Sequence, residues 1–133
     1  MRRALRLAEK GIGLVLPNPM VGAIIVQNGQ RIGEGFHEKF GGDHAEIVAI
    51  KNCKESVVGA TLYVTLEPCC HKGKTPACTD AIIKSGIKKV VIASLDPSEK
   101  VNGKGVEKLK EAGVEIEIGL LKEPAEELNE QFY

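Results

Sequence analysis

The sequence predicts an α/β protein of three layers (α/β/α), in which helices cover both faces of a five-stranded mixed sheet. Two observations predict this class. A hairpin pattern provides the first two predicted strands, and strands then alternate with helices from residue 44 onward. A hairpin is antiparallel and a strand–helix–strand order favours parallel neighbours, so we expect a mixed sheet. The 133 residues show no internal repeat, low-complexity tract or linker, and we expect a single domain over 1–133.

The first third of the chain predicts a helix followed by a hairpin. Residues 2–10 carry apolar side chains at helical spacing, and a glycine follows them. The runs 21–27 and 30–37 predict two strands, because the Asn-Gly pair between them is a strong two-residue hairpin signal. An antiparallel pair is therefore expected at the start of the sheet.

Helices and strands alternate in the middle of the chain. Residues 44–53 predict a helix, and the apolar, β-branched run 60–66 predicts a strand. Thr75 has the residue type of an N-cap, Pro76 suits the first helical position, and Gly86 suits the end of a helix. A second helix is therefore expected between Thr75 and Gly86.

The last third continues this alternation. Residues 88–94 and 114–120 predict strands, and residues 103–113 predict the helix between them. Residues 122–133 are expected to be helical. Together with the earlier segments, these complete the five strands.

The composition is that of an ordinary folded protein with balanced charge. Apolar residues make up 43% and charged residues 27%, and 18 Lys and Arg balance 18 Asp and Glu. Such a chain has no long-range attraction to a phosphate backbone. With two Tyr, three Phe and no Trp, an aromatic platform for several bases is not expected either. We therefore expect no nucleic-acid partner.

No segment of the sequence predicts export or a membrane span. The basic N-terminal segment interrupts its apolar residues with Arg6, Glu9 and Lys10, so it lacks the apolar stretch of a signal peptide. No apolar window has the length of a membrane span. We expect a cytoplasmic protein whose four cysteines stay reduced, and a bridge between the neighbours Cys69 and Cys70 would be strained.

Two segments combine the residue types of a zinc site. His44 begins a predicted helix, Cys78 lies in the first turn of another, and Cys69 or Cys70 follows the strand 60–66. In an α/β sheet these chain ends meet at one edge, where helix N-termini favour thiolates. Three N/S ligands and a vacant fourth position are typical of catalytic zinc. Neighbouring residues point apart, so at most one of Cys69 and Cys70 is expected to bind, and spacing alone does not choose between them.

Glu46 has the residue type of a general base beside such a metal. Two residues on a regular helix differ by about 200°, so His44 and Glu46 can serve one site only if the metal lies over the helix end. Glu46 would then lie beside the water at the vacant position rather than bind the metal. The plainer interpretation, a small buried apolar side chain, suits Cys53. It does not suit the polar, glycine-containing segment of the other three cysteines.

These residues lie in segments that resemble a known family. HAE at 44–46, followed by EPCCHKGKTPAC at 67–78, is similar to the H-x-E and P-C-x-x-C pattern of the cytidine-deaminase superfamily. Eight residues rather than two separate Cys69 from Cys78, and this longer loop resembles the deaminase domain of the riboflavin-pathway bifunctional deaminase/reductase. Three further segments extend the resemblance to essentially the whole chain: PNPMVGAIIV at 17–26, GEGFH at 33–37 and VNGKG at 101–105.

The resemblance implies a cytidine-deaminase-like fold and a zinc-dependent reaction. The implied reaction is hydrolytic deamination of 2,5-diamino-6-(5-phosphoribosylamino)pyrimidin-4(3H)-one, which releases ammonia. The resemblance assigns the zinc ligands to His44, Cys69 and Cys78, and the proton shuttle to Glu46. It also implies six substrate contacts, at Asn18, His37, His71, Lys74, Asp96 and Asn102.

The resemblance also concerns partners. The family joins this domain to a reductase, whereas residues 1–133 show no dinucleotide-binding fingerprint, so we expect the reductase to be a separate or fused unit. Association of identical subunits is also implied. The chain departs from the family pattern at Val48, Ala77 and Ser98, none of them an implied zinc ligand.

The residues alone support the substrate contacts less strongly. Lys74 and Thr75 precede a predicted helix N-terminus, where a ribose 5′-phosphate could bind, although a solvated lysine is the plainer interpretation. Asn18 lies between two prolines that fix its backbone, which suits either a rigid contact or a loop cap. His37 suits packing equally well, and His71 could orient another group.

Two other functions remain open. A zinc deaminase of cytidine, guanine or adenosine in transfer RNA would share the metal site. Balanced charge and few aromatic residues argue against the RNA, and the long loop argues against a simple nucleoside. A non-enzymatic zinc module would need a fourth ligand such as Cys53 or Cys70.

Overall fold

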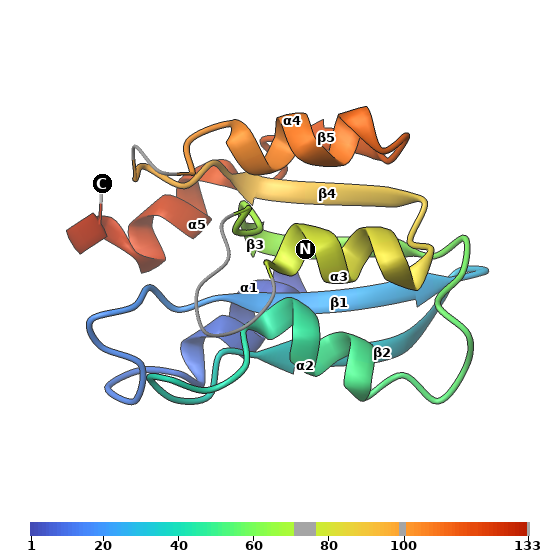
Figure 1. Cartoon of the computed structure of the whole chain (residues 1–133). Coiled ribbons are helices and arrows are strands. Elements are labelled where there is room, and N and C mark those ends of the chain that lie inside the picture. The colour runs from blue at the N-terminus through green and yellow to red at the C-terminus, as the bar shows by residue number, and fades with distance from the viewer. Residues whose placement is uncertain (71–76, 99–100, 133) are drawn as a thin grey trace.

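The computed structural model describes residues 1–70, 77–98 and 101–132, and it contains every strand and helix that the sequence predicts (Figure 1). The strands are β1 (Gly22–Gln27), β2 (Gln30–Phe36), β3 (Thr61–Leu66), β4 (Lys89–Ser94) and β5 (Glu115–Ile118). The helices are α1 (Arg2–Glu9), α2 (Ala45–Lys51), α3 (Cys78–Ser85), α4 (Lys104–Glu111), α5 (Lys122–Leu128) and the short 3₁₀ helix η1 (Glu130–Phe132).

The five strands form one mixed sheet in the order β2-β1-β3-β4-β5. β1 is antiparallel to both β2 and β3, while β3, β4 and β5 run parallel to one another. The register aligns apolar side chains across the centre of the sheet, with Leu62 opposite both Ile25 and Val90. The predicted mixed sheet is therefore confirmed.

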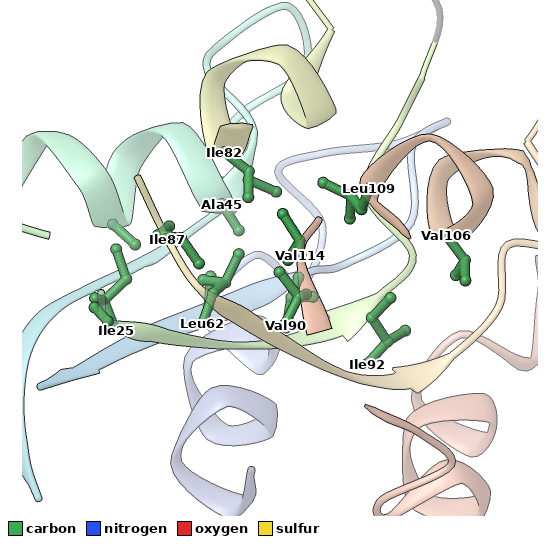
Figure 2. Packing of buried hydrophobic residues seen from close by; sticks show 14 residues of the cluster. Ile25, Ala45, Leu62, Ile82, Ile87, Val90, Ile92, Val106, Leu109 and Val114 are labelled. Carbon is green, nitrogen blue, oxygen red and sulfur yellow. The ribbon is translucent and has the colours of Figure 1, made fainter. Parts of the chain in front are cut away.

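Helices cover both faces of this sheet, which gives the predicted three layers. α2, α3 and α4 lie on one face, and α1 lies on the opposite face, where α5 contacts both α1 and β4 (Figure 1). The main core lies under α2, α3 and α4 (Figure 2), and its side chains include Ile25, Ala45, Leu62, Ile82, Ile87, Val90, Ile92, Val106, Leu109 and Val114. A smaller cluster formed by Ala4, Leu7 and Ile24 joins α1 to the other face.

Several predicted element ends differ from the structure, and the last helix ends at Leu128 rather than continuing through the predicted range 122–133. Two of the differences have a clear physical reason. The N-cap of α3 is Ala77 rather than Thr75, and Cys69 binds the first amides of that helix. Thr75 and Pro76 lie outside the described residues. β5 ends at Ile118 because Gly119 adopts φ 105°, which extended strands do not contain.

Among the described residues, no helix is both long enough and apolar enough to cross a membrane.

Candidate metal centre and active site

Three chain ends converge at one edge of the sheet. α2 and α3 begin on the side where β3 ends (Figure 1). His44 is the N-cap of α2 and has an extended backbone (φ −70°, ψ 159°), Cys78 is the first residue of α3, and Cys69 follows β3 by three positions. The ends of these elements therefore bring together His44 and Cys78, which are 34 positions apart in sequence.

The donor atoms of His44, Cys69 and Cys78 form a compact group. His44 Nδ1 lies 3.2 Å from Cys78 Sγ and 3.7 Å from Cys69 Sγ, and all three atoms lie within 4.8 Å of one another. With bonds of about 2.0–2.3 Å, the donors of a tetrahedral zinc site lie about 3.5 Å apart. The group therefore fits zinc in both its atoms and its spacing.

The two thiols are not equivalent in the absence of a metal. Their mutual hydrogen bond lowers the pKa of Cys69 to about 4 and raises the pKa of Cys78. A hydrogen bond to Cys69 also raises the pKa of His44. These shifts favour the thiolate form of Cys69 over that of Cys78. A thiolate is the form of cysteine that binds a metal.

Glu46 lies beside this group in a pocket of about 260 Å³ that His44 and Cys69 also line. Its side chain is 3% exposed, and burial is the main cause that raises the pKa of its carboxyl group to about 7. The negative charge of Cys69 raises that pKa further. A carboxyl group with such a pKa can both accept and release a proton at neutral pH.

Asn18 and His37 form a hydrogen-bonded pair beside the histidine of the candidate metal group. His37 is buried, and its Nδ1 donates to the carbonyl oxygen of Asp43 at 3.0 Å. That leaves Nε2 as the acceptor for the Asn18 amide at 3.1 Å. The edge of the His37 ring also meets the His44 ring, with centroids 5.4 Å apart. Asn18 and His37 thus form one rigid wall beside His44.

A family model described as the cytidine and deoxycytidylate deaminase zinc-binding region matches residues 1–94. The chain belongs to this deaminase family. Membership confirms the predicted enzyme class, and it confirms zinc as the metal that suits the group of three donors.

Two similar proteins have names that refer to a pyrimidine deaminase or to riboflavin biosynthesis. A diaminohydroxyphosphoribosylamino-pyrimidine deaminase of Buchnera aphidicola subsp. Schizaphis graminum is 50% identical over 100% of this chain and 90% of that protein. The riboflavin biosynthesis protein RibD of Aquifex aeolicus is 56% identical over 100% of this chain and 37% of its own length. The chain thus spans just over a third of this longer relative.

Solved structures agree with the fold. A crystal structure of a diaminohydroxyphosphoribosylaminopyrimidine deaminase/5-amino-6-(5-phosphoribosylamino)uracil reductase from Thermotoga maritima has a TM-score of 0.95 and 55% identity, and the match covers 99% of this chain and 38% of that one. The predicted cytidine-deaminase-like architecture is therefore confirmed.

Four further residues are predicted to contact the substrate. Two of them lie among the described residues, and one of these two lines the pocket. Asp96 lines the pocket. Asn102 is exposed, and its neighbour Val101 contributes to the pocket wall instead. His71 and Lys74 lie outside the described residues.

Cys53, one candidate for a fourth metal ligand, lies away from the metal group. Its Sγ donates to the carbonyl oxygen of Ala49 at 3.4 Å and packs against the main core. Within the part of the chain that the structure describes, the donor group consists of His44, Cys69 and Cys78. Such a group has the three donors of a catalytic site rather than the four of a closed structural one.

Sequence reasoning missed two buried polar residues near the site. Glu67 lines the pocket and accepts three backbone hydrogen bonds. The sequence offers one local signal for it, its position as an acidic residue between a predicted strand and Pro68. Asn129 pairs with both backbone groups of Met20, at 2.8 and 2.7 Å. No local signal exists for Asn129, because its partner lies 109 residues away.

Proposed function

We propose that the deaminase removes an amino group hydrolytically from 2,5-diamino-6-(5-phosphoribosylamino)pyrimidin-4(3H)-one and releases ammonia. The observation that carries this proposal is the buried carboxyl group of Glu46 in one pocket with three N/S donors. The choice of substrate is supported by the 50% identical Buchnera protein, which bears the name of this activity and has nearly the same length as this chain.

In this proposal, His44, Cys69 and Cys78 hold one zinc ion. When held by these three residues, zinc would supply the nucleophile, because a site with three protein ligands leaves room for a water whose pKa would fall from about 15.7 to about 7. The N-termini of α2 and α3 point toward the group, and their partial positive charge stabilises the thiolates.

In this proposal, Glu46 transfers protons from the attacking water to the substrate. Its raised pKa lets the carboxylate take a proton from the attacking water and deliver it to the ring nitrogen. It then takes the remaining proton from the hydroxyl group that has added to the ring carbon and gives it to the amino group, which leaves as ammonia while the carbonyl forms. The N-cap position of His44 supports this role, since both side chains then belong to the open first turn of α2 rather than to opposite sides of a continuous helix.

The pocket wall would orient the pyrimidine. The Asn18 amide is held by His37, so it presents a fixed hydrogen-bonding group toward the ring. Asp96 contributes an acceptor on the pocket wall. For the remaining contacts, we propose Asn102 and His71 for polar groups of the substrate and Lys74 for its phosphate.

The proposal extends to partners and location. A reductase partner is supported by the Thermotoga protein, which is described as a deaminase/reductase and of which this chain spans 38%. Self-association is supported by exposed apolar side chains at Ile12, Leu14, Leu16 and Phe40. A cytoplasmic location is supported by a charged substrate that does not cross membranes unaided and by thiols that need reducing conditions.

The test is ammonia release by zinc-loaded protein from a panel of amines: the phosphorylated diaminopyrimidine, cytidine, deoxycytidylate, guanine and transfer RNA. We expect release from the first, with kcat/KM at least about 100-fold above that for any other. A preference for cytidine or deoxycytidylate would contradict the assigned substrate and keep the reaction class. No release from any amine would contradict the proposed activity.

A further inference from the structure

Glu67 is a buried carboxylate that the proposed chemistry does not use. It directly follows the last residue of β3, and its side chain is 4% exposed. Oε1 accepts the backbone N–H groups of Asp96 at 3.2 Å and Gly103 at 3.0 Å, and Oε2 accepts that of Val106 at 3.1 Å. Three charge-assisted bonds to backbone amides fix the segments on which these amides lie.

Two of the three donors belong to the N-terminus of α4. Gly103 is the N-cap and has no side chain that could bind the free amides of the first turn. Glu67 takes that role from another part of the chain, and its negative charge suits the positive end of the helix. The first turn of α4 packs closely against the segment after β3, because a Cβ atom at Gly105 would overlap the carbonyl oxygen of Pro68.

The third donor lies at the other end of the loop between β4 and α4. Asp96 is the second residue of this loop and Gly103 is its last, so a single carboxylate binds the backbone near both ends. Asp96 and Val101, from the same loop, line the pocket that Glu46 also lines. Glu67 is also two residues from Cys69 in the chain. It therefore connects the segment that bears a metal donor with a loop that forms the pocket wall.

We propose that Glu67 is a positioning residue for substrate binding: it fixes the two described ends of the β4–α4 loop, at Asp96 and Gly103, at the distance from the metal group that the pyrimidine requires. This inference rests on the proposed function for its substrate. The loop geometry does not depend on which base is deaminated. Loss of Glu67 should therefore weaken substrate binding more than it slows the chemical step.

The test compares Glu67→Gln with Glu111→Gln, the same change at an exposed residue at the end of α4. The glutamine keeps one acceptor oxygen but places an N–H₂ group against backbone donors. We expect KM to rise about tenfold, kcat to stay within about threefold, and zinc content to stay at the wild-type value. Glu111→Gln should behave as wild type.

Three outcomes would overturn the inference. Unchanged KM would show that the loop does not need Glu67. A loss of kcat at constant KM would give it a role in the reaction itself, and loss of zinc would make it a support of the metal group.

Hydrogen exchange provides a test that needs no activity, and its measurement on the wild-type protein needs no folded variant either. In the wild-type protein, the amides of Asp96, Gly103 and Val106 should be protected to within about tenfold of Leu62 in β3. In Glu67→Gln these three should exchange faster while Leu62 is unchanged. Unprotected amides in the wild type would overturn the inference even if no substrate were turned over. A wild-type protein with protected amides and no turnover would instead contradict the proposed function alone.

Discussion

The backbone N–H of Cys78 donates a hydrogen bond of 3.3 Å to the Sγ atom of Cys69. The next amide, that of Thr79, donates to the carbonyl oxygen of Cys69 at 3.1 Å. Cys69 therefore caps α3, whose own N-cap residue, Ala77, has no polar side chain. Because the side chain of Glu67 caps α4 in a similar way, the short segment after β3 joins the proposed metal ligand Cys69 to the N-termini of two helices.

Replacement of Glu46 by glutamine tests the proposed proton carrier. Glutamine has the same shape but cannot accept a proton, so we expect kcat for ammonia release to fall about 1,000-fold or more while zinc content is unchanged. Glu55→Gln, at an exposed position, is the matched control and should leave both values unchanged. Near-normal turnover in Glu46→Gln would remove Glu46 from the mechanism.

The pairing of Asn129 with Met20 predicts an effect on stability. Asn129→Ala leaves the N–H and C=O of Met20 without their partners, and we expect a loss of about 2 kcal/mol in the free energy of unfolding in urea. Asn52→Ala removes one exposed hydrogen bond, to the carbonyl oxygen of Glu34, and should cost less than about 1 kcal/mol. Equal losses in the two variants would contradict the importance of the Asn129 pairing.

The ion pair between Arg3 and Glu34 predicts a pH-dependent contribution to stability. The hydrogen bond from Arg3 lowers the pKa of Glu34 below its ordinary value of 4.5. A carboxyl group with a lowered folded-state pKa stabilises the fold above its ordinary pKa, and this contribution is lost as the pH falls through the lowered value. Glu34→Gln should therefore destabilise the protein at neutral pH and lose this effect as the pH falls below 4.5 and through the lowered pKa of Glu34.

The expected size of that effect is small. Both side chains are about 40% exposed (41% and 38%), so solvent screening limits the loss to less than about 1 kcal/mol. Glu9→Gln, at an exposed position on α1, is the control. A difference between wild type and Glu34→Gln that is the same at neutral and acidic pH would contradict the assigned cause.

The elements of the fold could be predicted because their signals are local. The hairpin turn is an example: Asn28 and Gly29 both have positive φ, at 52° and 77°, as the two-residue turn requires. The convergence of His44 and Cys78 could also be predicted, because it follows from helices that begin at one edge of the sheet. Their roles in binding zinc remain a prediction.

Residues whose partners are distant in sequence could not be predicted in this way. Glu67 binds amides 29 to 39 positions further along the chain, and nothing in its own neighbourhood identifies them. The wrong N-cap at Thr75 has a related cause. Thr75 has the right residue type, but Cys69 supplies the acceptors for α3 from across a loop, and sequence periodicity carries no information about such contacts.

The zinc-to-protein ratio of purified wild type, Cys69→Ser and Cys70→Ser tests the central claim most directly. The serine variants are a matched pair, since the two cysteines are adjacent and the same atom is exchanged in each. We predict about one zinc per chain in the wild type and in Cys70→Ser, and a loss of most zinc in Cys69→Ser. A wild-type protein without zinc, or a Cys69→Ser variant that keeps it while Cys70→Ser loses it, would contradict the account.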